Sequence, residues 1–262
     1  MRSPGALAAR RSGLYPTALT LALVLAACSG GKTTSNAANS SNPTTASTAS
    51  TASTASTEIN GPPRFPTSAA DTATVRRFLV TAGDLPGSWT MTGQVHGLDA
   101  GVQPSTGNEP CFGTPSPDTH QTADLTSPQF QDPTGTMTVF STALAFDQPS
   151  WVDQDIANDL GPDGQRCAVA GDQEVAPVLH WTNLVVSIGR PPAGSPPTVR
   201  DVTHTSYDQT GPQGAQHVIE DSYLFAQGRF EVSLNFESTR GAIPPALEDA
   251  VVSQVAERLA TG

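Results

Sequence analysis

A short apolar segment that ends at Cys28 determines which part of the chain is left to fold. The segment, residues 17–27, is shorter than the roughly 20 apolar residues of a membrane-spanning helix. It suits the core of a signal peptide, and basic residues precede it. It closes with Leu-Ala-Ala directly before Cys28, the pattern of a bacterial lipobox. We therefore expect residues 1–27 to be a lipoprotein signal peptide and Cys28 to carry the lipid.

The alternative interpretation is an ordinary signal peptide with a cysteine that follows it by chance. The pair Arg10 and Arg11 also fits export by the twin-arginine route. One acyl chain binds a membrane weakly, whereas two or three hold a protein there firmly. A lipidated Cys28 therefore predicts a stable lipid anchor at the cell membrane, with the mature chain on the extracytoplasmic face.

Residues 28–66 form a segment rich in Ser, Thr and Ala, with four consecutive Ala-Ser-Thr triplets over residues 46–57. Such a composition cannot bury enough apolar surface to offset the entropy lost on folding. We expect a disordered tether, either a plain spacer or an O-glycosylated stalk. The globular domain then spans residues 67–262, a length that permits a sizeable core.

Charge limits the partners of the chain. The sequence has 13 basic and 24 acidic residues, a net charge of −11. Removing the three arginines of the signal peptide takes the mature chain from −11 to −14. Because a negative surface repels nucleic acid, we expect no nucleic-acid partner. The expected partners are the membrane, through the N-terminal lipid, and a small or lipidic envelope ligand or an envelope protein.

Two cysteines remain in the domain after Cys28 is lipidated, Cys111 and Cys167. Cysteines of exported domains usually pair, so we expect a structural disulfide between them. The alternative is two free, buried thiols.

Hydrophobic periodicity predicts a mixture of helices and strands. Helices are expected over residues 70–81, from about 150 to 160, and over 245–259; strands are expected over 136–146, 178–188, 199–207, 216–225 and 229–237. Residues 98–133, rich in Pro, Gly, Ser and Thr, are expected to form a long irregular loop.

The strand over residues 229–237 carries the clearest pattern. Aromatic and aliphatic residues alternate there with Glu231, Ser233, Asn235 and Glu237. This alternation predicts one packed face and one face in water. We expect an α+β fold: a mostly antiparallel sheet with helices packed on one face, the last helix covering the apolar face of this strand, in a single domain behind a disordered stalk.

The common catalytic and metal-binding patterns are missing from the sequence. It has no G-x-S-x-G, no C-x-x-C and no glycine-rich phosphate loop. The five histidines lack the spacing of a zinc site. His204 and His217 can still meet across neighbouring strands, which leaves a metal site there as an alternative. We expect no cofactor and no metal.

Two further groups of residues are candidates for function. The pairs Glu220–Asp221 and Glu231/Glu237 have the chemistry of an acid and a base, although charges that alternate along a hairpin usually form a solvated face. Trp151, Trp181 and Tyr223 are candidates for the lining of a ligand groove beneath the helices, and core packing is the alternative for the tryptophans.

Several landmarks together resemble a known group of proteins. They are the turn Asp-Leu-Pro-Gly-Ser-Trp at residues 84–89, Cys111, Ala-Phe-Asp at residues 145–147 before a helix, Cys167, and a closing strand with an amphipathic helix. This order is similar to that in actinobacterial cell-envelope lipoproteins and in the extracellular sensor domain of mycobacterial serine/threonine protein kinase H.

The resemblance implies a helix-backed sheet with a cleft for an envelope ligand. Those sensor domains typically have four cysteines in two disulfides, whereas this domain has two cysteines, and no kinase domain is attached. Sensing by this chain would therefore need a separate signalling partner.

These observations favour a non-enzymatic, lipid-anchored protein whose domain binds a ligand or a partner. One alternative is a structural protein-interaction module of an envelope complex. Another is a divergent hydrolase that acts on wall polymers through carboxylates.

Overall fold

The computed structural model describes residues 67–97, 111, 120–211 and 214–262. The expected signal peptide, Cys28 and the tether of residues 28–66 lie outside the described residues. All of the described residues belong to one compact unit. Within them, no helix combines the length and the apolar character needed to cross a bilayer.

The described part of the chain contains helices and strands in mixed order. The helical elements are α2 (Ala69–Phe78), the 3-10 turn η1 (Ala82–Asp84), α3 (Pro149–Leu160), α4 (Gly164–Leu179) and α5 (Pro245–Thr261). The strands are β1 (Thr90–Thr92), β2 (His96–Gly97), β3 (Gln121–Thr126), β4 (Gln129–Gln131), β5 (Met137–Phe146), β6 (Trp181–Gly189), β7 (Val199–Gly211), β8 (Gly214–Gln227) and β9 (Phe230–Ser238).

The nine strands form one antiparallel sheet in the order β1-β4-β5-β9-β8-β7-β6, and β3, which pairs with β2, also pairs with β5. The expected hairpin is formed by β8 and β9, and it lies at the centre of this sheet. Its register places Glu220 directly across from Glu237 and Ser222 directly across from Asn235. Neighbouring positions along a strand point to opposite faces, so this register fixes which side chains share a face.

Helices α2 and α5 pack on the first face of the sheet and enclose the main apolar core. The strand residues of this core include Val232, Leu234 and Phe236 of β9, all completely buried. Helix α5 contributes its expected stripe: Leu247, Val251, Val255 and Leu259. The prediction that the last helix covers the apolar face of the hairpin is therefore confirmed.

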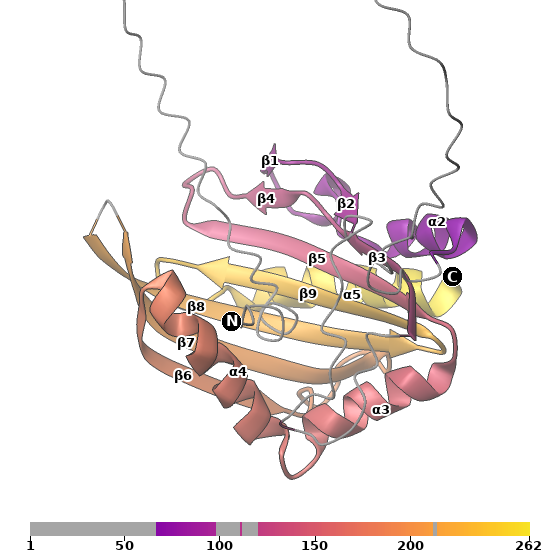
Figure 1. Cartoon of the computed structure of the whole chain (residues 1–262). Coiled ribbons are helices and arrows are strands. Elements are labelled where there is room, and N and C mark those ends of the chain that lie inside the picture. The colour runs from indigo at the N-terminus through magenta and orange to yellow at the C-terminus, as the bar shows by residue number, and fades with distance from the viewer. Residues whose placement is uncertain (1–66, 98–110, 112–119, 212–213) are drawn as a thin grey trace, which may run out of the picture. The chain divides into compact units, whose positions relative to one another are not determined.

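Helices α3 and α4 pack on the second face, where smaller apolar clusters hold them. Val152 of α3 packs with Leu144 and Phe146 of β5, and Ala176 of α4 packs with Tyr207 of β7. Figure 1 shows α4 in front of β6 and β7 and α5 behind the sheet. The α+β class, the mostly antiparallel sheet and the single domain are confirmed, and α3 and α4 add a helical layer on the second face.

The sequence reading missed helix α4. It begins directly after α3, at Gly164, where a β-carbon would lie 1.8 Å from the carbonyl oxygen of Asp159, so only glycine fits. The helix has a glycine at its first position and Pro177 near its end. Both residues have a low helix propensity, so the sequence pattern did not predict a helix here. Residues 178 and 179 close this helix, and strand β6 begins at Trp181, later than expected.

Two other expectations need correction. Strands β3 and β4 occupy part of the stretch expected to be an irregular loop, and they pair with the apolar strand β5. The polar face of β9 does not meet water: Glu231 and Asn235 are 1% and 0% exposed, and Glu237 is partly buried. The physical reason is the second helical layer, which covers that face.

Candidate functional site

A small polar hollow lies between α4 and the second face of the sheet. We call it the acidic hollow; it is lined by Ala168, Asp172, Val186, Thr203, Thr205, Glu220 and Ser222. The hollow is narrow, with room for about one water molecule. It joins α4 with three neighbouring strands, so its composition depends on the tertiary fold.

Strand register explains why the lining is polar. Thr205 of β7 lies directly across from Glu220 of β8, which in turn lies directly across from Glu237 of β9. Thr203 and Ser222 form the next cross-strand pair on the same face. Two side chains of β7 and two of β8 therefore lie on one face and line the hollow together with Asp172 of α4.

Glu220 is the most unusual residue of the hollow. Its side chain is 2% exposed, and neither carboxylate oxygen has a hydrogen-bond partner. Burial, together with the nearby carboxylates Glu237, Asp172 and Asp221, raises the pKa of Glu220 well above its ordinary value. Burial also raises the pKa of Glu237. Burial and these carboxylates therefore favour the protonated form of Glu220 over its charged form.

Asn235 adds a second buried polar group without a partner. It is completely buried, and neither its amide nitrogen nor its amide oxygen has a hydrogen-bond partner. It shares the second face with Glu237 and lies directly across from Ser222, which lines the hollow. Because most buried polar groups in proteins are hydrogen-bonded, these two side chains make the region a candidate site.

The tryptophans and the tyrosine expected to line a groove do not come together. Trp151 of α3 stacks on His120 with ring centroids 3.7 Å apart, and Trp181 of β6 stacks on Tyr207 at 4.1 Å. Both lie on the second face, in separate apolar clusters. Tyr223 is on the first face, where its hydroxyl donates a hydrogen bond to Glu248 Oε1 at 3.0 Å. The prediction that one groove is lined by all three residues is therefore wrong.

Tyr223 belongs instead to a chain of polar groups where α5 packs on β8. Glu248 contacts Asp221, which bonds to His204 Nδ1 at 2.6 Å. Burial and the charge of Asp221 raise the pKa of Glu248 to about 7. Burial and Glu248 raise the pKa of Tyr223. This chain fixes the start of α5 to the sheet.

The two histidines that were candidates for a metal site are held apart. His204 pairs with Asp221, and His217 pairs with Asp208 at 2.8 Å, at separate positions along the β7–β8 hairpin. Throughout the part of the chain that the structure describes, no three or more His, Cys, Asp or Glu side chains are grouped so as to hold a metal ion.

The expected disulfide is present in the structure. Cys111 and Cys167 are bonded, with their Cα atoms 5.6 Å apart. Because Cys167 lies in α4, one position from Ala168 of the hollow, the bond fixes the helix that covers the site.

The sequence matches no known protein-family model and no curated protein. Among solved structures, the chain is similar to the extracellular domain of PknH from Mycobacterium tuberculosis, at 10% identity and a TM-score of 0.36; the alignment covers 76% of this chain and 100% of that chain. It is also similar to LpqN, involved in cell envelope biogenesis of Mycobacterium tuberculosis, at 12% identity and a TM-score of 0.22, covering 70% and 87%. Both likenesses are distant, so the function proposed below depends on the residues of this chain.

Sequence reasoning found part of this site and missed the rest. Glu220 and Glu237 were candidates as an acid and a base, but as members of different pairs and on a solvated face. Asp172 was missed because its helix was missed. The alternating pattern of the hairpin gave no signal of this burial, because polar residues on every second position normally indicate a solvated face.

Proposed function

We propose that the chain is a lipid-anchored, extracytoplasmic binding protein without catalytic activity, and that the acidic hollow is its ligand site. The lipobox at Cys28 and the disulfide support an exported protein. The observation that carries the binding role is Glu220, a buried carboxylate with two unpartnered oxygens in the wall of a hollow.

A buried carboxyl group without partners is costly for folding. Removing such a polar group from water without a compensating hydrogen bond costs about 1–3 kcal/mol by protein mutational data, and more when it is charged. A group of this kind is favoured where a ligand supplies the missing partner. The cost and the position in a hollow together support a binding role.

The acidic hollow lacks the space that the hydrolase alternative needs. Glycoside hydrolases place two carboxyl groups about 5–9.5 Å apart on either side of a sugar linkage. The acidic hollow has room for about one water molecule, so a sugar ring does not fit between Glu220 and Glu237.

The interaction-module alternative lacks a continuous apolar surface in the described residues. The large apolar side chains exposed there are Met91, Leu160, Val178 and Val185, which belong to four different elements. Single exposed apolar residues are ordinary on protein surfaces.

The anchoring part of the proposal is tested by Cys28→Ala in cells that process lipoproteins. Native chain should partition into detergent with the membrane fraction and be cut by protease added outside intact cells. The Cys28→Ala variant should leave the detergent phase. Equal partitioning of both proteins would refute lipid anchoring at this cysteine.

The binding part is tested by native mass spectrometry of the full mature chain purified from its source. We expect a co-purifying small molecule on the wild type and its loss in Glu220→Gln. The matched control is Glu257→Gln, which removes one exposed carboxylate from α5. A bound molecule retained equally by all three proteins, or found on none, would contradict a ligand site at Glu220.

A further inference from the structure

We propose that the acidic hollow binds the ammonium group of a small primary amine, with Glu220 as its anionic partner; this inference rests on the proposed binding function.

The lining offers mainly hydrogen-bond acceptors. Glu220 presents two unpartnered carboxylate oxygens, and the hydroxyl groups of Thr203, Thr205 and Ser222 also line the hollow. A hydroxyl can accept as well as donate, and the Ser222 hydroxyl already bonds to that of Ser233 at 3.1 Å. A primary ammonium group has three N–H donors and no acceptor. The three N–H donors of the ammonium group therefore match the acceptor oxygens that line the hollow.

The size of the hollow selects among cations. It has room for about one water molecule. A primary ammonium group is compact, whereas a guanidinium is a broad planar fork. A multivalent metal ion needs several converging ligands, and the described residues contain no such group. A single ammonium is the organic cation that fits this space.

The charge around Glu220 also favours a cation. The groups that face it are Glu237 from β9, Asp172 from α4 and Tyr207 from β7, and Asp221 of its own strand adds a nearby negative charge from the opposite face. Three of these four are carboxyl groups, and none of the ion pairs found among the described residues involves Glu220. A positive group in the hollow would relieve the repulsion that now keeps Glu220 protonated.

Binding is expected to release a proton. At pH values where Glu220 holds its proton in the hollow, the amine enters as its ammonium ion. The bound state pairs the Glu220 carboxylate with that ammonium, so the proton of Glu220 leaves to solvent and no covalent bond changes. By linkage, the affinity should rise with pH while Glu220 is still protonated in the free protein. It should fall again near the pKa of the amine, about 10.4 for a lysine-like ammonium.

The test is isothermal titration of the full mature chain in detergent with n-butylammonium. Comparison probes are n-butanol, tetramethylammonium, guanidinium and potassium ions. We expect n-butylammonium to bind at least tenfold more tightly than each comparison probe. Glu220→Gln should abolish this preference, and Glu257→Gln should keep it. Circular dichroism of Glu220→Gln checks that its fold is retained.

The outcomes separate the two proposals. If Glu220→Gln loses a co-purified ligand but n-butylammonium does not bind the wild type, the ammonium assignment is overturned and the binding site stands. Equal binding of tetramethylammonium would overturn it as well, because that ion has no N–H donor. Titrations in buffers of different ionisation enthalpy, repeated over a range of pH, should show proton release on amine binding that decreases as pH rises; no release at any pH would contradict pairing with a protonated Glu220.

Discussion

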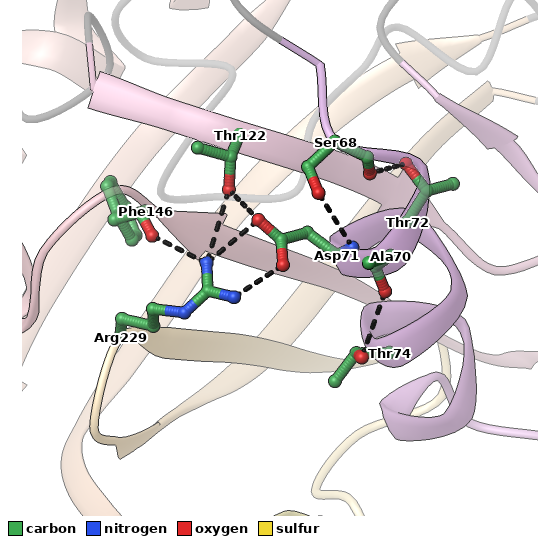
Figure 2. A network of polar contacts seen from close by, with 8 residues as sticks. All are labelled: Ser68, Ala70, Asp71, Thr72, Thr74, Thr122, Phe146 and Arg229. Carbon is green, nitrogen blue, oxygen red and sulfur yellow. Dashed lines mark hydrogen bonds and ion pairs between the residues drawn. The ribbon is translucent and has the colours of Figure 1, made fainter.

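Arg229 and Asp71, 158 residues apart in the sequence, form a two-point ion pair that ties α2 to the turn of the β8–β9 hairpin. Figure 2 shows the guanidinium facing both oxygens of the carboxylate. Arg229 also donates to the carbonyl oxygen of Phe146 at 2.9 Å, and the Thr122 hydroxyl donates to Asp71 at 2.5 Å. One pair therefore joins α2, β3, β5 and the central hairpin.

We expect Arg229→Ala to lower the free energy of unfolding by about 2–3 kcal/mol, because it leaves the buried Asp71 carboxylate without its cation. This value lies below that of a fully buried pair because about a third of the Arg229 side chain is exposed. Urea denaturation measures the change. The control is Arg240→Ala at an exposed position, and an equal loss in both variants would refute a special role for the pair.

The same pair should set the acid limit of stability. Arg229 and Thr122 lower the pKa of Asp71 below its ordinary value of 3.8. A carboxyl whose pKa is lower in the folded state adds stability above its unfolded pKa, and this is lost as pH falls through the folded value. The Asp71→Asn variant should lose less stability than the wild type between pH 4 and about 2. Parallel denaturation curves of both proteins over this range would contradict the assignment.

Glu220 should act in the opposite direction. Its pKa is raised by folding, so the folded chain holds this proton more tightly than the unfolded chain. Stability should therefore fall as pH rises above about 4.5, by up to about 1.4 kcal/mol per pH unit for one group. Glu220→Gln should be more stable than the wild type at pH 7, with a smaller slope. Some slope should remain, since Glu237 and Glu248 also have raised pKa values.

Breaking the disulfide should destabilise the domain and loosen α4. Cys111 and Cys167 are 56 residues apart, and the chain-entropy model gives about 4 kcal/mol for a loop of that length. Reduction should lower the melting temperature and speed hydrogen exchange in α4 more than in α5. An unchanged melting temperature, with two thiols titrating before reduction, would show that the disulfide does not form.

Gln165 should protect the free edge of the sheet. Its side-chain amide donates to the carbonyl oxygen of Val186 at 2.6 Å and accepts from the N–H of Ile188 at 2.8 Å. Strand β6 is the last strand at this edge, and exposed edges invite pairing between chains. We expect Gln165→Ala to lose about 1–2 kcal/mol of stability and to self-associate.

Sedimentation velocity over rising protein concentration measures that association. Gln173→Ala, at an exposed position of the same helix, is the matched control. Self-association of the control to the same extent, or of neither variant, would show that Gln165 does not guard the edge.

The main elements of the fold could be predicted because their signals are local. The alternation from Phe230 to Phe236 identified β9, and the four-residue spacing from Leu247 to Leu259 identified α5. The sequence also placed Cys111 and Cys167 in one bond, since they are the two cysteines that remain after the lipobox. What each polar residue faces depends on which element packs there: the alternation along β9 predicted a solvated face, whereas Glu231 and Asn235 are buried.

The sequence by itself determined the acidic charge, and it predicted the disulfide and the β8–β9 hairpin from composition and short-range periodicity; export and lipid anchoring stay predictions. Only the tertiary structure decided that helices cover both faces of the sheet. That covering buries Glu220 under Asp172 of α4, and it separates Trp151 and Trp181 from Tyr223. The physical reason is that desolvation of a carboxyl group depends on atoms far away in sequence, and no local pattern records them.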